Sequence, residues 1–188
     1  FGVGAEAGAE RLAHLHELGF EIGNHTATHA RLDQQDAAGV QRELAGGVSA
    51  ITDAVPEAQV RTMSLPLGQW PADRSLAAAG EHDGVAYDHE AVMLVGAHPS
   101  ASPHHVDFSP VEEGVPRIAT LPSVSYDPDD AAHRFTSAYW LEVFEESPDR
   151  RYVSDGDPAT ISFPAERSGE LAEGLGERAN PYEEDAGD

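Results

Sequence analysis

The chain has 188 residues and no cysteine. This absence excludes disulfide bonds, a thiolate nucleophile and zinc sites built from thiolates. It leaves the redox compartment open, because a chain without cysteine is compatible with any compartment. A zinc site in this protein would have to use histidine and carboxylate ligands.

Positive charge is scarce as well. The 11 basic residues are all arginine, and they face 34 Asp and Glu, for a formal net charge of -23. Nucleic acids and anionic membrane surfaces bind proteins through clustered basic residues, so this balance argues against both as partners. It favours a neutral or cationic ligand.

Long apolar runs are also missing. The hydrophobic content is 40% and the mean hydropathy is -0.41, and no segment approaches the roughly 18 apolar residues of a membrane span. The length suits one domain with a real core. We predict a domain over residues 1–164, followed by a disordered tail over residues 165–188, which are acidic, rich in glycine and poor in aromatic residues.

Helical and strand patterns alternate along the chain. Apolar residues at three- and four-residue intervals predict helices over residues 6–18, 34–55, 72–79 and 131–146. Short apolar segments predict strands over residues 20–23, 60–65, 84–87, 91–96, 151–154 and 159–163, and residues 98–116 read as a long loop. This alternation predicts an α/β fold with a mainly parallel sheet or a barrel.

Two histidines four positions apart form the most informative motif. His25 and His29 follow a short apolar segment and a Gly-Asn break, where a loop at a strand end could direct both imidazoles at one Zn²⁺ ion. Two ligands do not complete a zinc site, so a third side chain, most often a carboxylate, would have to come from elsewhere. The simpler alternative is a pair of loop histidines that are hydrogen-bonded to backbone.

The surroundings of this pair resemble a known family. The segments "GFEIGNHTATHARL", "LPLG", "EAVMLVGAHP", "VPRI" and "RYVSDGDP" are similar to polysaccharide deacetylases, the NodB-homology domain of carbohydrate esterase family four, from Phe1 to about Pro164. The resemblance implies a distorted (β/α) barrel, incomplete at the N-terminus, with the site at the C-terminal ends of its strands.

The resemblance also implies a set of metal ligands. It assigns His25 and His29 as two ligands of a divalent metal, most simply Zn²⁺, and it places the third ligand and the general base in a Thr-Phe-Asp-Asp motif. That motif is not in the chain, so we expect an N-terminally truncated deacetylase domain. Such a fragment should bind metal weakly and be inactive alone.

The implied activity is hydrolysis of acetyl groups on a polysaccharide or amino-sugar polymer, at carbon–nitrogen bonds other than peptide bonds. The implied partner is an acetylated glycan in carbohydrate or cell-wall metabolism. The expected location is extracellular or at the cell surface. The sequence predicts no oligomeric state.

Two positions depart from the family pattern. Ser64 and Leu67 stand where the family's Arg-x-Pro-Tyr-Gly motif has arginine and tyrosine, although the Leu67 N–H could still hold an oxyanion, because a backbone donor does not depend on the side chain. Ser154 stands at the histidine position of the family's Leu-x-His motif, and in the family that histidine is the general acid. Asp155, if its pKa were raised, could act as the general acid, and a plain turn at Asp155–Pro158 is the simpler interpretation.

Other aromatic, histidine and arginine residues carry weaker hypotheses. Trp70 lies beside the Pro66–Gly68 loop and could stack on a sugar ring. His98, His104 and His105 could be further ligands, but exposed loop histidines are the default. Arg117 could pair with a site carboxylate or form a surface ion pair.

Two other functions remain open on the sequence. The chain could be a catalytically impaired module of the same fold that binds glycan without turning it over. It could also be a hydrolase of small non-peptide amides.

Overall fold

A computed structural model describes residues 7–96, 98–118, 133–147 and 154–183. The chain divides into two compact units. The first unit comprises residues 1–96 and 109–117, and the second comprises residues 97–108 and 118–188. Each unit is described by itself.

The helices of the first unit begin and end close to the predicted positions. They are α1 (Gly8–Glu17), α2 (Ala37–Ala54) and α3 (Ser75–Ala78), with the short 3-10 turns η1 (Leu32–Gln34) and η2 (Pro66–Gly68) between them. Helix α2 begins after Asp36, whose carboxylate accepts a hydrogen bond from the Gly39 N–H at 2.7 Å. Helix α1 ends before Gly19, which adopts the left-handed conformation at φ 83°.

Four short parallel segments form the framework of this unit. Strand β1 (Thr62–Ser64) pairs in parallel with β4 (Ala91–Met93). Single parallel bridges extend the pair on both sides, from Asn24 to Met63 and from Met93 to Val115. The strand predicted over residues 20–23 is therefore reduced to one bridge at Asn24. The carboxyl ends of all four segments meet at one edge, where parallel sheets place their polar loops.

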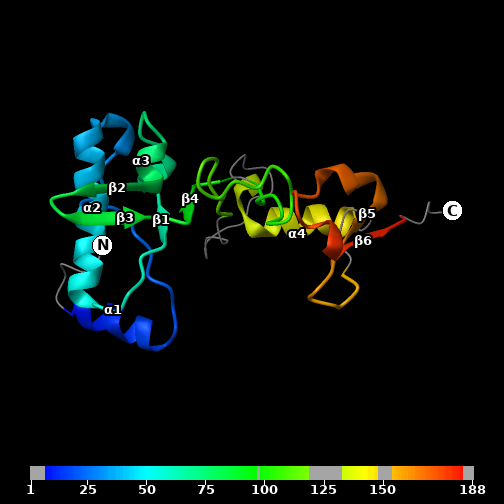
Figure 1. Cartoon of the computed structure of the whole chain (residues 1–188), viewed down its shortest axis with the longest axis horizontal. Helices are drawn as coiled ribbons and strands as arrows, with labels where there is room; N and C mark the ends of the chain where they lie inside the picture. The colour runs from blue at the N-terminus through cyan, green and yellow to red at the C-terminus, as the bar shows by residue number, and fades with distance from the viewer. Residues whose placement is uncertain (1–6, 97, 119–132, 148–153, 184–188) are drawn as a thin grey trace. The chain divides into compact units, whose positions relative to one another are not determined.

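A hairpin that the sequence did not predict follows α3. Strands β2 (Ala79–His82) and β3 (Val85–Asp88) pair in antiparallel fashion around Asp83 and Gly84, which have φ values of 50° and 79°. Both strands contact α2, as Figure 1 shows. Two successive positive φ values are typical of the tight turn that matches the twist of paired strands.

The core of the first unit lies between α2 and strands β1 and β4. Val40 and Leu44 of α2 pack with Met63, Leu65 and Val92, and all five are at most 2% exposed. Complete burial of such side chains contributes roughly 1.5–3 kcal/mol each. The α2 helix and strands β1 and β4 are therefore held together, and the loops at their ends have a fixed base.

The α/β class is confirmed by this mixture of helices and strands. Within the described ranges, the strands form three separate pairs, and they do not close into a barrel. The expected distorted barrel is therefore not confirmed by the described residues.

The second unit contains short elements. They are η3 (His133–Phe135), α4 (Ser137–Glu146), β5 (Ile161–Pro164), η5 (Ala165–Glu170), η6 (Gly176–Arg178) and β6 (Ala179–Tyr182). Strand β6 pairs in parallel with β5, with Ile161 opposite Ala179. Residues 165–182, expected as a disordered tail, thus hold helical turns and a paired strand, and the boundary predicted at residue 164 falls inside this pairing. The strand predicted over residues 151–154 lies almost wholly outside the described residues.

No helix in the described part of the chain has the length and apolar character that crossing a membrane requires.

Candidate functional site

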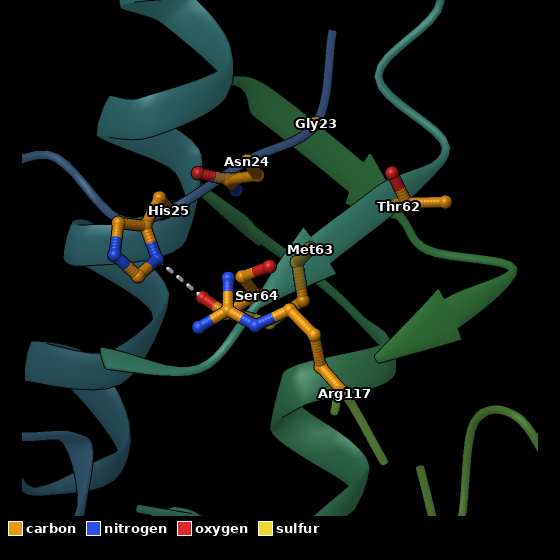
Figure 2. Close-up of a pocket in the computed structure, with 7 residues that line it drawn as sticks. All are labelled: Gly23, Asn24, His25, Thr62, Met63, Ser64 and Arg117. Carbon is orange, nitrogen blue, oxygen red and sulfur yellow. Dashed lines mark hydrogen bonds between the residues drawn. The ribbon is translucent and has the colours of Figure 1, made fainter. Parts of the chain in front are cut away.

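His25 lies at the edge where the parallel segments end. The Asn24 N–H donates to the Thr62 carbonyl at 2.8 Å, and the Ser64 N–H donates to the Asn24 carbonyl at 2.8 Å, so the chain leaves the sheet directly before His25. The His25 Nδ1 atom lies 2.7 Å from the Ser64 carbonyl oxygen (Figure 2). A carbonyl only accepts, so Nδ1 carries the proton and Nε2 presents its lone pair.

His29 is brought back toward His25 by a strained loop. The two ring centroids are 4.8 Å apart with an interplanar angle of 77°. Thr26 and His29 both have positive φ values, 66° and 60°, which non-glycine residues seldom adopt. Such conformations cluster where a loop must present side chains in one direction, and each costs about 1–3 kcal/mol.

Glu43 on α2 holds this loop. Its two carboxylate oxygens accept from the Thr28 N–H and the Thr28 hydroxyl, both at 2.9 Å, and its carbonyl accepts from the Ala27 N–H at 2.9 Å. Glu43 is only 8% exposed. Hydrogen bonds to a buried carboxylate are stronger than neutral ones, so a helix in the core fixes the loop that carries His29.

Asn24 anchors the other end of the loop in the core. Its side-chain amide donates to the Leu44 carbonyl at 3.0 Å and contacts His89 Nε2 at 3.3 Å, while its Oδ1 accepts from the Thr26 N–H at 3.0 Å. Gly47 is required opposite, because a Cβ atom there would lie 2.1 Å from the Asn24 Oδ1. The position of His25 is therefore set by a fully buried neighbour.

His89 supports Asn24 from beneath. It is 2% exposed, and its Nδ1 donates to the Ala77 carbonyl at 2.8 Å while its ring stacks on Tyr87 at 5.3 Å. Burial lowers the pKa of His89, against smaller opposite effects of the Ala77 carbonyl and Asp88. Burial also raises the pKa of Tyr87 to about 12, so this support is uncharged at neutral pH.

A pocket of about 300 Å³ opens beside His25. It is lined by Gly23, Asn24, His25, Thr62, Met63, Ser64 and Arg117 (Figure 2). The volume is at the lower end of the roughly 300–1,000 Å³ of small-molecule sites. A sugar substituent rather than a whole polymer segment fits a space of this size.

The two predicted metal ligands, His25 and His29, lie close together. Their rings converge, and the buried Thr26 hydroxyl between them in sequence has no hydrogen-bond partner among the described residues. Within those residues, however, no group of three or more His, Asp or Glu side chains is gathered as a metal site requires. The third ligand that the resemblance implies is therefore not provided by the described part of the chain.

Leu67 and Trp70 lie in the neighbouring loop and do not line this pocket. Leu67 is at the centre of η2 with a φ of 57°, and its side chain is 57% exposed. Trp70 packs against the core, and the Arg74 guanidinium lies 5.0 Å from its ring centroid. The oxyanion donor at Leu67 and the sugar platform at Trp70 stay predictions, and Arg74 already occupies one face of the platform.

Asp155, in the second unit, has surroundings that oppose the acid role. Its Oδ2 accepts from the Thr160 hydroxyl at 2.5 Å and from the Asn180 amide at 2.7 Å, and its Oδ1 accepts from the Asp157 N–H at 2.9 Å. These hydrogen bonds, led by that of Thr160, lower the pKa of Asp155 to about 2. This direction is opposite to the raised pKa that a general acid needs, and the contacts fit the turn interpretation, so the acid role of Asp155 stays a prediction.

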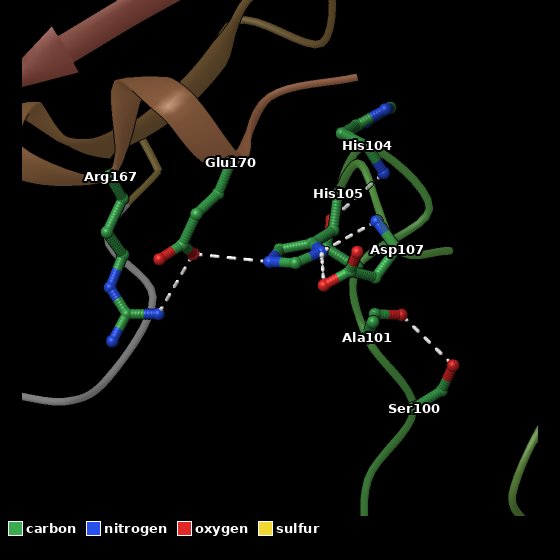
Figure 3. A network of polar contacts seen from close by, with 8 residues as sticks. Ser100, Ala101, His104, His105, Asp107, Arg167 and Glu170 are labelled. Carbon is green, nitrogen blue, oxygen red and sulfur yellow. Dashed lines mark hydrogen bonds and ion pairs between the residues drawn. The ribbon is translucent and has the colours of Figure 1, made fainter. Parts of the chain in front are cut away.

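The loop histidines of the second unit have structural partners (Figure 3). His105 Nδ1 accepts from the Asp107 N–H at 3.0 Å, so its Nε2 carries the proton and faces the Glu170 carboxylate at 3.2 Å. Backbone bonds from Val106 to Glu170 and from Ala172 to His104 reinforce the contact. His105 therefore joins the predicted long loop to η5. His98 is exposed, and its Nδ1 contacts the Pro99 carbonyl.

Geometry thus defines the first unit as an α/β unit that presents a histidine pair at the carboxyl ends of parallel segments. Residues 1–85 match the sequence profile of the polysaccharide deacetylase family, and this match supports a polysaccharide deacetylase domain in the first part of the chain. The match includes His25, His29, Leu67 and Trp70 and ends before Asp155. No solved structure matches the chain.

Sequence reasoning missed three supporting residues. Glu43 interrupts the apolar stripe of α2 beside Leu44, and a carboxylate in such a stripe indicates a buried partner. His89 continues the alternation of Val85 and Tyr87 in β3, which indicates burial on the same face. Asn24 gives no such signal, because in the sequence it is part of a Gly-Asn break.

Proposed function

We propose that the polysaccharide deacetylase domain is a metal-dependent hydrolase that removes acetyl groups from a glycan or amino-sugar polymer. The observation that carries this proposal is the Nδ1–H of His25 donating to the Ser64 carbonyl. Metal-ligating histidines almost always donate their second ring N–H to a carbonyl or carboxylate, which fixes the ring and raises its basicity. The Nε2 atom of His25 is then ready to bind a cation.

His25 and His29 would hold the metal, with Zn²⁺ the best match to two imidazoles. When bound, the metal would polarise an acetyl carbonyl and lower the pKa of water. Asn24 and Glu43 would hold the two rings in position from the core. The Leu67 N–H would donate to the acetyl oxygen that becomes negative. The chain would thereby bind and orient the acetyl group at the edge of the parallel segments.

A metal titration with matched variants tests this proposal. His25→Ala and His29→Ala should each weaken Zn²⁺ binding by more than the roughly 10–100-fold typical of losing an outer partner, because a direct ligand is removed. His14→Ala, which removes an exposed histidine of α1, is the control and should bind as the parent does. Calorimetry measures all four proteins. Equal Zn²⁺ affinity in the parent and both site variants would refute the metal site.

The activity is measured separately as acetate released from acetylated glucosamine oligomers, with and without Zn²⁺. Chelation should abolish any release, and His25→Ala should do the same. Metal-independent release would contradict the proposal, and turnover of small amides without turnover of glycans would favour the amide-hydrolase alternative.

Two observations favour the second candidate, a glycan-binding module of impaired activity. The lowered pKa of Asp155 argues against its role as the general acid, and Ser64 and Leu67 depart from the family motif. For such a module, acetylated oligomers should bind in a titration and remain intact after prolonged incubation with Zn²⁺.

A further inference from the structure

The pocket beside His25 has a charge opposite to that of the chain as a whole. Arg117 is the one lining residue with a fixed charge, and none of the seven described lining residues is a carboxylate. Arginine stays protonated at all accessible pH values. A chain with a net charge of -23 therefore presents a positive group in its candidate site.

The backbone holds Arg117 in place. The Leu94 N–H donates to the Val115 carbonyl at 2.9 Å, and the Gly96 N–H donates to the Arg117 carbonyl at 3.2 Å. Gly96 permits this approach, because a Cβ atom there would lie 2.5 Å from the Pro116 Cβ and 3.0 Å from the Arg117 nitrogen. Arg117 thus emerges from the fourth parallel segment at the edge where His25 leaves the first.

The other lining groups complement a guanidinium. In Figure 2 the Arg117 side chain extends toward His25 and Ser64. Thr62 and Ser64 bring hydroxyl groups to the same pocket, although the Thr62 hydroxyl already donates to Glu21 at 2.8 Å. A planar guanidinium forms paired hydrogen bonds with a carboxylate, and hydroxyls add single donors.

We propose that Arg117 makes this pocket a carboxylate-binding site. The ligand would be a small carboxylate, borne either by a hexuronate unit of the glycan or by free acetate. The assignment of a glycan as its source rests on the proposed function, whereas carboxylate binding itself does not. An anionic ligand departs from the neutral or cationic ligand that the net charge favours, because local charge at contact distance outweighs distant charges that are screened within about 10 Å at 0.1 M salt.

Ligand titrations of the full chain test the proposal, with chelator present so that metal plays no part. Sodium acetate, glucuronate and neutral N-acetylglucosamine are added to the parent and to Arg117→Gln, and pocket resonances are followed by NMR. Loss of a charged hydrogen bond should weaken carboxylate binding roughly tenfold or more. Arg117→Lys should fall between the two, because it keeps the charge and loses the paired geometry.

Arg61→Gln is the matched control. Arg61 is an exposed arginine just before β1 that faces Glu90 at 3.7 Å and lies outside the pocket lining. The Arg61→Gln substitution changes the net charge by the same amount as Arg117→Gln, and it should leave carboxylate affinity unchanged. Circular dichroism of each variant checks that the fold is retained.

The three ligand titrations distinguish a hexuronate from free acetate, and they distinguish carboxylate binding from deacetylase activity. Binding of glucuronate that depends on Arg117 assigns the site to an acidic glycan, and binding of acetate alone assigns it to the released acid. No carboxylate binding in the parent, or equal weakening in Arg61→Gln and Arg117→Gln, overturns the proposal. The deacetylase proposal is tested independently, by the Zn²⁺ titration and by acetate release.

Discussion

At the scale of single residues, buried neighbours determine where the His25 side chain lies. Asn24 uses both donors and its acceptor on fixed groups, and His89 is held beneath it by the Ala77 carbonyl. Both ring nitrogens of His89 are satisfied only when it is neutral, because Nε2 faces the Asn24 amide donor. Protonation would place two donors against each other in a buried site.

This arrangement predicts a pH-dependent stability. The folded pKa of His89 is lowered by burial, so its contribution is fully present above the unfolded pKa of about 6.5 and is lost as pH falls below that value. The slope for one proton is at most about 1.4 kcal/mol per pH unit. Urea unfolding of the parent and of His89→Gln, between pH of about 7.5 and 5, measures it. The variant should be less stable at neutral pH and show a flatter profile.

The Asp88 carboxylate acts on His89 in the opposite direction to burial, and the pKa of Tyr87 is raised to about 12. Other histidines titrate in both proteins, so only the difference between the two profiles is diagnostic. Parallel profiles for the parent and His89→Gln would show that His89 does not contribute the pH dependence.

At the scale of elements, sequence patterns predicted helices better than strands. The periodicity of α2 predicted the helix to within a few residues, and Asp36 caps it, whereas Asp33 pairs with Arg31 at 2.7 Å in the preceding turn. Strand β2 was missed since the run Leu76–Ala79 favours helix locally, and pairing with β3 overrides that preference. The Asp83-Gly84 pair was the available signal for the hairpin.

The candidate site, like the fold, was predictable from the sequence only in part. His25 and His29 stood out because spacing and flanking sequence are local properties, and the structure brings their rings together. The sequence supports two interpretations of Arg117, because this residue is 92 positions from His25 and only the parallel pairing of β4 with Val115 brings it to the same pocket. Contacts that depend on sheet order are not readable from local patterns.

Helix α2 provides the element-scale prediction. Glu43→Ala removes the two carboxylate bonds to Thr28, so it should destabilise the protein by about 1.5–3 kcal/mol, the usual cost for bonds to a charged group. It should also weaken Zn²⁺ binding by roughly 10–100-fold, because the loop carrying His29 is released. Calorimetric metal titration, at a temperature where each variant is fully folded, separates the second effect from the first.

Two further variants sharpen this test. Glu43→Gln keeps one acceptor for Thr28 and should recover part of the metal affinity, whereas Glu57→Ala, which removes an exposed carboxylate beyond α2, should behave as the parent does. Unchanged metal affinity in Glu43→Ala, with lowered stability, would restrict Glu43 to a structural role.

At the scale of the whole molecule, the charge imbalance is the dominant property. Exposed ion pairs among the described residues oppose it, such as Arg61–Glu90 at 3.7 Å and Arg74–Glu113 at 3.5 Å. Exposed pairs of this kind contribute roughly 0–1 kcal/mol each. With 34 acidic and 11 basic residues, repulsion among carboxylates exceeds this attraction, and it opposes the compact state of both units.

Salt should therefore stabilise this protein. Added NaCl shortens the screening length from about 30 Å at 0.01 M to about 10 Å at 0.1 M and 3 Å at 1 M, so carboxylate repulsion weakens steeply at first and then levels off. We expect the thermal midpoint, followed by circular dichroism, to rise with NaCl along such a saturating curve. Sucrose, which is excluded from the surface but screens no charge, serves as the control and should give a gradual rise without a plateau. A midpoint that stays constant or falls from low to high NaCl would mean that the ion pairs outweigh the repulsion.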